Sequence, residues 1–175
     1  MLEPEMKILY TRETIATEVR RLAAEISTEF SGEEVLMICV LKGSFLFFAD
    51  LVREITIPVV VDFVRVASYG SETQSSGIVE IRKDVELSLK NQNVIIVEDI
   101  IDSGYTIETL FHRLQQRSPK VLKVCTLIDK SGRREVDFTA DYVGVSMEDG
   151  FIVGYGLDLD ERYRNLCEIY LVENA

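Results

Sequence analysis

Apolar residues repeat along this chain in two patterns, one typical of helices and one typical of buried strands. After Thr11, a candidate N-cap, they recur at intervals of four, three and four, which is the spacing of one helix face. Short apolar runs predict strands at Val35–Leu41, 59–66, 94–97 and 121–128, and the most uniform of them are expected to be buried on both faces of a parallel sheet. The apolar positions on the helix face that follows Thr11 are Ile15, Val19, Leu22 and Ile26.

Two further helices are predicted between these strands. Ser44 is a candidate N-cap for the first, which presents an apolar face between Phe48 and Ile55, and residues 106–116 form the second. Strands that alternate with helices predict an α/β fold, in which a parallel sheet is flanked by helices on both faces. After Asp141, short strand-like runs at 142–145 and 151–155, with glycines between and within them, predict a small appended subdomain, called the hood below.

The stretch 67–77, ASYGSETQSSG, interrupts this alternation. Its small polar residues cannot build a core, so we expect a mobile loop. Beyond it, apolar residues from Val79 to Leu89 alternate loosely with polar ones, which suits a hairpin or edge strands. Residues 91–93 then form a turn.

Composition limits the classes of protein. The 175 residues fit a single domain, and 47% hydrophobic with 28% charged residues is typical of a globular chain. A net charge of -11 disfavours nucleic acid and anionic membranes as partners. No signal peptide or membrane-spanning run is apparent, so the expected location is cytoplasmic. Cys39, Cys125 and Cys167 lack the spacing of a zinc site or disulfide framework and are expected to be buried thiols.

The segment 94–106, VIIVEDIIDSGYT, carries the most informative chemistry. A buried strand leads into three acids, Glu98, Asp99 and Asp102, which are costly beside branched aliphatic residues unless they are used. Ligands of parallel sheets bind at the carboxyl ends of strands, where the next helix presents unpaired N–H groups suited to phosphate. Gly104 permits close approach, and Ser103 and Thr106 add hydroxyl donors. The paired acids suit a ribose diol and a magnesium ion.

This segment resembles the phosphoribosyl diphosphate (PRPP) motif of type I phosphoribosyltransferases, and its surroundings are similar to the hypoxanthine-guanine branch of that family. The resemblance extends from about Val35 to Leu166. It implies transfer of phosphoribose from PRPP to N9 of hypoxanthine or guanine, with Mg²⁺ as cofactor and a homodimer or homotetramer as the assembly. By this resemblance Glu98 and Asp99 hold the ribose hydroxyls and magnesium, and Asp102 is the general base toward purine N7. The resemblance also implies that four residues bind the 5′-phosphate: Ser103, Gly104, Tyr105 and Thr106.

Motifs elsewhere extend the resemblance. LKGS at 41–44 is similar to the diphosphate loop of the family, which implies a non-proline cis peptide beside Lys42 and diphosphate binding by Lys42 and Gly43. Arg164 is similar to the arginine that clamps diphosphate. Ser68 and Tyr69 resemble the pair at the tip of a loop that closes over the reaction and excludes water.

The same resemblance implies a purine site in and near the hood. Lys130 would donate to the purine 6-oxo group, which favours hypoxanthine and guanine because an ammonium cannot accept from the 6-amino group of adenine. Phe151 would stack on the base and Ile152 would offer backbone contacts. Asp158 would lie in the same region and supply a second carboxylate for magnesium.

Some residues depart from the pattern or stay outside it. Ser103 and Tyr105 stand where family members often carry threonine and a small or basic residue, which puts the phosphate affinity in question. His112 is expected to face solvent or cap its helix, and Arg133 and Arg134 to be surface or interface charges.

Two other functions stay open at this point. A phosphoribosyltransferase for another base, such as xanthine, adenine, uracil or orotate, is disfavoured by Lys130 and Phe151, although these residues do not separate xanthine from hypoxanthine and guanine. A regulator that keeps this fold to sense PRPP and bind nucleic acid is disfavoured by the acidic net charge.

Overall fold

The computed structural model describes residues 4–69 and 78–173 and is built around a six-stranded sheet with the order β4-β3-β2-β5-β6-β7. Strands β3, β2, β5, β6 and β7 pair in parallel, and β4 joins β3 antiparallel at the edge. The predicted α/β class is confirmed, with one antiparallel strand added. The strands are β2 Val35–Leu41, β3 Val59–Tyr69, β4 Ile78–Lys83, β5 Asn93–Ile101, β6 Val121–Lys130 and β7 Tyr142–Met147.

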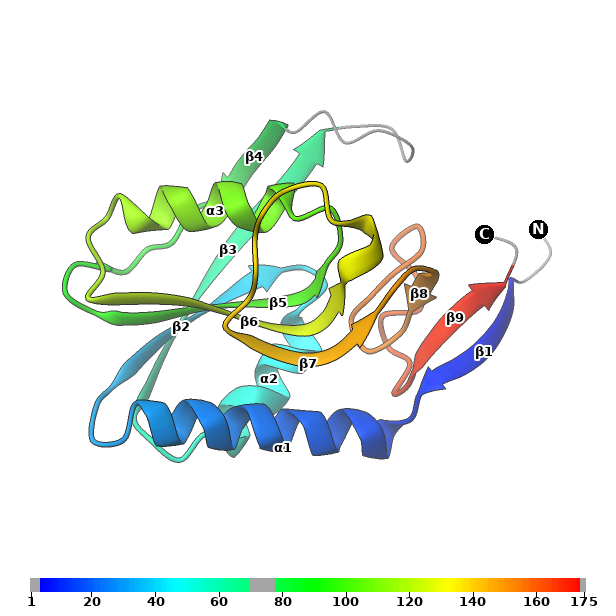
Figure 1. Ribbon diagram of the computed structural model, residues 1–175, viewed down its shortest axis with the longest axis horizontal. Helices are drawn as coiled ribbons and strands as arrows, with labels where there is room; N and C mark the ends of the chain where they lie inside the picture. The colour runs from blue at the N-terminus through cyan, green and yellow to red at the C-terminus, as the bar shows by residue number, and fades with distance from the viewer. Residues whose placement is uncertain (1–3, 70–77, 174–175) are drawn as a thin grey trace.

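Helices cover both faces of this sheet, as predicted (Figure 1). Helices α1 (Arg12–Glu29) and α2 (Phe45–Glu54) lie on one face, and α3 (Tyr105–Gln115) lies on the other. Successive residues of β2 therefore pack into two different cores, because side chains alternate across a strand. Val35, Met37 and Cys39 join the core under α1 and α2, and Leu36, Ile38 and Val40 join the core under α3. No helix in 4–69 or 78–173 has the length and apolar character needed to cross a membrane.

The two helix caps proposed from the sequence differ in outcome. Thr11 caps α1 as predicted, since its hydroxyl accepts a hydrogen bond from the Thr14 N–H at 3.2 Å. Ser44 occupies the N-cap position of α2 but makes no side-chain cap. Its backbone is already helical, and its fully buried hydroxyl donates instead to the Val40 carbonyl. Ser44 thus fastens α2 to the end of β2.

A second, three-stranded antiparallel sheet forms the hood, with the order β1-β9-β8. Strand β8 (Phe151–Val153) agrees with the prediction, although it is shorter, and β9 (Ile169–Glu173) belongs to the same carboxyl-terminal region. Strand β1 (Glu5–Tyr10) was not predicted, and it brings the amino-terminal segment beside β9 (Figure 1). The prediction that residues 142–145 belong to the hood was wrong, because β7 pairs with β6 in the main sheet.

The predicted loop at 67–77 is shorter than expected. Ala67, Ser68 and Tyr69 extend β3 and pair with β4, which confirms the expected edge strand near Val79 and Ile81. Residues 70–77 lie outside the part of the chain that the structure describes. Leu87 and Leu89 do not continue a strand; their segment follows β4 as an irregular connection to β5.

Asp62 holds this connection against β3. It is 5% exposed, and its Oδ2 accepts hydrogen bonds from the Glu86 N–H at 2.8 Å and the Leu87 N–H at 2.9 Å. Burial works against the charged form, but the N–H groups of Leu87, Phe63 and Glu86 hold the pKa of Asp62 below its ordinary value of 3.8. The ionised carboxylate of Asp62 therefore accepts backbone hydrogen bonds that a neighbouring strand would otherwise have accepted.

We expect Asp62→Asn to lower the free energy of unfolding by about 1–3 kcal/mol at pH 7, because buried hydrogen bonds to a charged acceptor are lost or weakened. The depressed folded-state pKa makes this contribution complete above pH 3.8, the ordinary value, and lost as the pH falls through the folded value. Urea unfolding at pH 7 and pH 3 measures both effects. The exposed Asp137→Asn is the control, and an equal loss of stability in both variants would contradict the role of Asp62.

Candidate active site

The predicted acids Glu98 and Asp99 lie inside β5, which runs past them to Ile101. Each is 8% exposed, and the Glu98 carboxylate accepts a hydrogen bond from the Asp99 N–H at 3.3 Å. Burial, reinforced by repulsion from Asp99, raises the pKa of Glu98 well above its ordinary value. Burial also raises the pKa of Asp99, against which the charge of Arg164 acts only weakly. The pair is thus a costly buried acid site that a cation or hydroxyl donors would stabilise.

An uncapped helix start follows the acids. Gly104 is the N-cap residue of α3 with φ 93°, a conformation that suits glycine, and no side chain caps the helix. Ser103, Gly104 and Thr106 line a hollow of about 230 Å³ together with Glu98, Asp99 and Asp102. The free N–H groups of the first helical turn are suited to an anion such as a phosphate.

The side chain of Tyr105 does not line this hollow and is partly exposed at the first position of α3. A backbone N–H at this position is available to a ligand whatever the side chain is. A tyrosine is therefore compatible with anion binding at this helix start.

The loop after β6 supports the segment before α3 from the side. The Glu135 N–H donates to the Ser103 carbonyl at 2.9 Å, and a Cβ on Gly104 would collide with Val136 and Arg134. Arg134 is partly buried and pairs with Asp129. Arg134 was predicted to be a surface or interface charge, and the surface alternative was wrong, because Arg134 packs inside this loop.

Asp102 lies between two cations. Its Oδ2 is 3.4 Å from Lys130 Nζ, and its Oδ1 is 3.5 Å from Arg133 Nε. Lys130 is 4% exposed, so its ammonium is held in place by burial, whereas Arg133 is exposed. Lys130 and Asp102, which the sequence suggested separately, are therefore neighbours, and Arg133 is a neighbour that the sequence did not suggest.

The segment Leu41–Ser44 approaches the acids closely. The peptide between Leu41 and Lys42 is cis, as the resemblance implied. A Cβ on Gly43 would collide with the Asp99 carboxylate, and a Cβ on Gly156, which has φ 102°, would collide with the Gly43 carbonyl. Glycine is therefore required at both positions for three segments of chain to meet here.

Cations gather in a second hollow of about 290 Å³, which shares Lys42, Gly43 and Asp99 with the first. Arg164 Nη2 is 2.8 Å from Asp158 Oδ1, and its Nη1 donates to the Gly156 carbonyl at 2.7 Å. The structure thus brings together the predicted Lys42, Asp158 and Arg164. Arg65, Arg82 and Glu161 also line this hollow and were not suggested by the sequence.

Three predicted purine contacts, Lys130, Phe151 and Ile152, do not line either hollow. Phe151 is 40% exposed at the start of β8, and Ile152 is buried against β9. The turn before β8 nevertheless lies beside the segment after Lys130, since a Cβ on Gly132 would collide with the backbone of Glu148. The chain around Phe151 is therefore near Lys130.

Ser68 and Tyr69 end β3, and their backbones pair with Val79 and Ile78. Their side chains, and the rest of the predicted closing loop at 70–77, lie outside what the structure describes.

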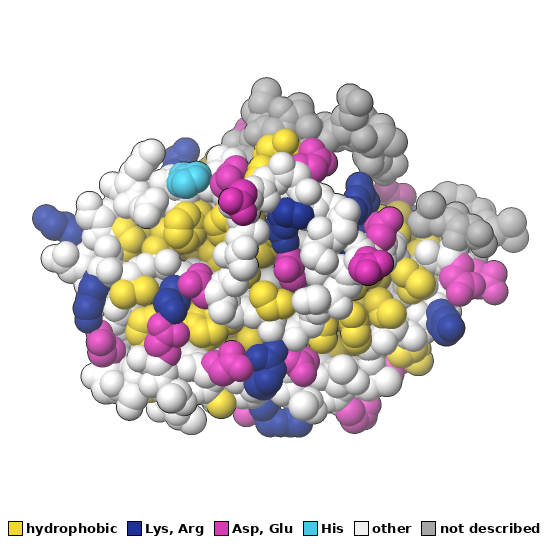
Figure 2. Space-filling model, viewed as in Figure 1, with side chains coloured by type: hydrophobic (Ala, Val, Ile, Leu, Met, Phe, Trp, Pro, Cys, Tyr) yellow, Lys and Arg dark blue, Asp and Glu magenta, His cyan; other side chains and the backbone are white. Residues whose placement is uncertain are grey.

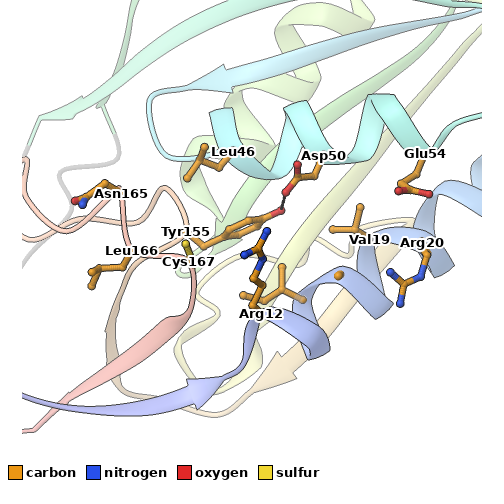
Figure 3. Close-up of a pocket in the computed structure, with 12 residues that line it drawn as sticks. Arg12, Val19, Arg20, Leu46, Asp50, Glu54, Tyr155, Asn165, Leu166 and Cys167 are labelled. Carbon is orange, nitrogen blue, oxygen red and sulfur yellow. Dashed lines mark hydrogen bonds between the residues drawn. The ribbon is translucent and has the colours of Figure 1, made fainter.

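A separate hollow of about 390 Å³ lies between α1, α2 and the hood (Figure 3). At its centre the Tyr155 hydroxyl donates to Asp50 Oδ2 at 2.6 Å, and burial followed by this hydrogen bond raises the pKa of Tyr155. Cys167 lines it and is exposed, contrary to the buried thiol predicted, whereas Cys39 and Cys125 are buried. None of the predicted site residues lines it. The hydrogen bond from Tyr155 to Asp50 joins the hood to α2.

Comparisons with known proteins agree with this geometry. The family model described as "Phosphoribosyl transferase domain" matches residues 5–160. The chain belongs to the phosphoribosyl transferase family. It is 44% identical to the hypoxanthine-guanine phosphoribosyltransferase of Aquifex aeolicus over 97% of this chain and 96% of that one. The corresponding Bacillus subtilis enzyme is 44% identical over 97% and 94% of the two chains.

Solved structures of this family have the same fold. A hypoxanthine-guanine phosphoribosyltransferase of Bacillus anthracis, with HEPES in its active site, superposes with a TM-score of 0.92 at 48% identity and covers 97% of this chain and 99% of that one. A hypoxanthine phosphoribosyltransferase of Staphylococcus aureus gives a TM-score of 0.92 at 39% identity, covering 95% and 91%.

The oxygen donors present would fit a magnesium ion that binds together with a phosphorylated ligand. No three His, Cys, Asp or Glu side chains in 4–69 and 78–173 converge as a metal cluster. Glu98 and Asp99 offer only oxygen ligands, and both oxygens of Asp158 are engaged, one by Arg164 and one by the Glu161 N–H. Mg²⁺ typically binds one or two carboxylates together with water and substrate phosphates, which matches such an incomplete set.

The sequence missed the cations and the acid that complete this site. Arg133 and Arg65 belong to no motif in the sequence. Glu161 lies in a turn with positive φ angles that its residue types do not predict. His112, in contrast, is exposed on α3, as expected.

Figure 2 shows acidic and basic side chains interspersed over the visible face.

We expect Glu98→Gln to raise the midpoint of thermal unfolding of the ligand-free protein by about 2–6 °C, because one of two adjacent buried acids is neutralised. The exposed Glu148→Gln provides the control with an equal change of charge. Differential scanning calorimetry makes the measurement. A lower midpoint for Glu98→Gln would show that the acid pair is stabilising and would refute the account of its cost.

Proposed function

We propose that this protein transfers the phosphoribosyl group of PRPP to N9 of hypoxanthine or guanine, giving IMP or GMP and diphosphate, as a purine-salvage enzyme. One observation carries the proposal: a buried acid pair, an uncapped helix start and a group of cations open into two adjoining hollows. These three features match the ribose, 5′-phosphate and diphosphate of one substrate. Membership of the family and the names of its similar relatives support the same conclusion.

The first hollow suits the ribose phosphate end of PRPP. Ser103, Gly104 and Thr106, with the backbone of Tyr105, bind the 5′-phosphate at the start of α3. Glu98 and Asp99 accept hydrogen bonds from the ribose hydroxyls, which relieves part of the cost of their burial.

The second hollow suits the diphosphate. Lys42 and Arg164 contribute positive charge to it, and Gly43 lets backbone approach the phosphates without a side chain between them. Magnesium, held at two separate places by the pair Glu98 and Asp99 and by Asp158, each together with phosphate oxygens, would neutralise charge on the leaving group. The protein cations stabilise the same charge as it develops on departure.

Asp102 and Lys130 serve the base. Asp102 acts as general base toward purine N7, a role supported by its partial exposure and by the 3.4 Å contact with Lys130. Lys130 donates to the 6-oxo group, Phe151 stacks on the ring and Ile152 provides backbone contacts. Burial of Lys130 at 4% exposure fixes the position of that donor.

Ser68 and Tyr69 belong to a loop that closes over the substrates in this proposal. Their position at the end of β3, the strand that also carries Arg65 of the second hollow, supports it. Closure excludes water, which would otherwise compete with the purine for the activated ribose.

The proposal includes a single catalytic domain, an oligomer and a cytoplasmic location. Core and hood both contribute residues to the second hollow, which supports one functional domain at 1–175. Val61 and Phe63 are 44% and 37% exposed on β3 beside Phe48 of α2, an apolar surface that suits a homodimer or homotetramer. PRPP and nucleotides are highly charged and cross bilayers poorly, which supports the cytoplasm.

Initial rates with PRPP, Mg²⁺ and each of hypoxanthine, guanine, xanthine and adenine test the function. We expect nucleotide and diphosphate to form with hypoxanthine and guanine at a kcat/KM at least about tenfold above that for adenine, since Lys130 cannot accept a hydrogen bond from a 6-amino group. Diphosphate release without nucleotide, or a preference for adenine, would overturn the substrate assignment.

Asp102→Asn should lower kcat by about 100-fold or more, because a general base contributes roughly 10²–10⁴-fold. PRPP binding should stay close to that of the unmodified protein, since Asp102 faces the base. Steady-state kinetics combined with calorimetric titration of PRPP separates the two effects. Weak PRPP binding with normal turnover at saturation would assign Asp102 to binding instead.

A further inference from the structure

Glu161 joins the two cations assigned to diphosphate. Its Oε1 is 2.7 Å from Lys42 Nζ, and its Oε2 is 3.1 Å from Arg164 Nη2. The two cations come from opposite parts of the fold: Lys42 follows β2 of the core, and Arg164 lies in the hood region before β9. One carboxylate thus uses both of its oxygens to connect core and hood.

The turn that carries Glu161 is specialised. Leu159 and Arg162 exchange backbone hydrogen bonds of 3.3 Å and 3.0 Å around Asp160 and Glu161, which have φ 50° and 63°. A two-residue turn with both corners at positive φ is typical of glycine and asparagine rather than glutamate. The Glu161 N–H also donates to Asp158 Oδ2 at 2.8 Å. The backbone therefore holds Glu161 in an unfavoured conformation that presents its carboxylate to the cations.

The side chain itself is not locked in place. Glu161 is 61% exposed and Lys42 is 43% exposed, so water can replace the Glu161 carboxylate at little cost if another anion takes the cations. Lys42, and then Arg164, lower the pKa of Glu161, so this carboxylate is ionised at neutral pH. It resembles a phosphate group in having negatively charged oxygens that can bind two cations at once.

We propose that Glu161 is an internal competitor of diphosphate: it occupies Lys42 and Arg164 in the ligand-free enzyme, leaves them when PRPP binds, and returns as diphosphate departs. The proposal rests on the proposed function, which assigns these two cations to diphosphate. Glu161 then weakens the binding of PRPP and of product diphosphate alike, and in doing so promotes product release. A carboxylate that only positioned the two cations would have the opposite effect, because its removal would weaken diphosphate binding.

Glu161→Gln removes the charge and keeps the length of the side chain. We expect the dissociation constant of inorganic diphosphate with Mg²⁺, measured by calorimetric titration, to fall by roughly three- to tenfold, the size expected for one exposed ion pair, with Lys42, and one partly buried ion pair, with Arg164. The KM for PRPP should fall in the same direction, and the difference should shrink at high ionic strength because screening weakens the ion pairs.

Asp160→Asn is the matched control. It removes the same charge from the adjacent exposed corner of the same turn, where the side chain contacts neither cation in the described structure. Its diphosphate affinity should stay near that of the unmodified protein. IMP affinity should not change in either variant, because its phosphate binds at Ser103–Thr106. Glu161→Asn, which tolerates positive φ, repeats the test in case glutamine disturbs the turn.

The outcomes separate this proposal from the proposed function. Diphosphate titration requires no turnover, so tighter binding by Glu161→Gln supports competition whichever base is the substrate. Unchanged or weaker diphosphate binding in both Glu161 variants overturns the competitor role, while the base assay still decides the reaction. Tightening of equal size in Asp160→Asn would also overturn it, since the effect would then follow net charge alone.

Discussion

The structure of this site depends on the burial of two adjacent carboxylates, Glu98 and Asp99, within the carboxyl-terminal half of the central strand β5. Such a pair is costly, as the raised pKa of both groups indicates. Three segments meet over it only because Gly43 and Gly156 lack a Cβ. The segment Leu41–Ser44 and the hood are thereby brought within reach of Asp99, so the acids determine where the other groups of this site can lie.

Charge is divided between the two parts of the fold. The core supplies the buried acids and the start of α3, whereas Arg164 and Asp158 come from the hood region. Lys42 lies at the boundary, where Glu161 connects it to Arg164. A substrate that carries a ribose diol and a diphosphate would contact both parts at once, so its binding and the docking of the hood are physically coupled. The Tyr155 hydroxyl, bound to Asp50, adds a second connection of the hood to α2.

The sequence predicted the core well because its signals are local. The apolar run Val35–Leu41 forms β2 with those bounds, and the segment around Glu98 retains the order of strand, acids and helix start that its residues implied. It failed where pairing is long-range. Nothing within 142–145 distinguishes a strand beside β6 from one in the hood, and β1 is defined only by its pairing with β9. Arg133 and Glu161 became site residues only through folding, because their contacts are to Asp102 and Lys42, far away in the chain.

Groups proposed to bind substrate already have partners of opposite charge within the protein. Lys130 pairs with Asp102, Arg164 with Asp158, and Lys42 with Glu161. When substrate binds, it therefore replaces existing ion pairs rather than pairing with free charges. The net free energy of binding is smaller than the number of new contacts suggests. The acid pair Glu98 and Asp99 differs, because within 4–69 and 78–173 no ion pair compensates it, and buried acids of this kind gain most from a ligand that brings a cation. Affinity for a magnesium-bound substrate should thus arise mainly at the acids, while the exchangeable pairs keep the product's diphosphate from being held too tightly.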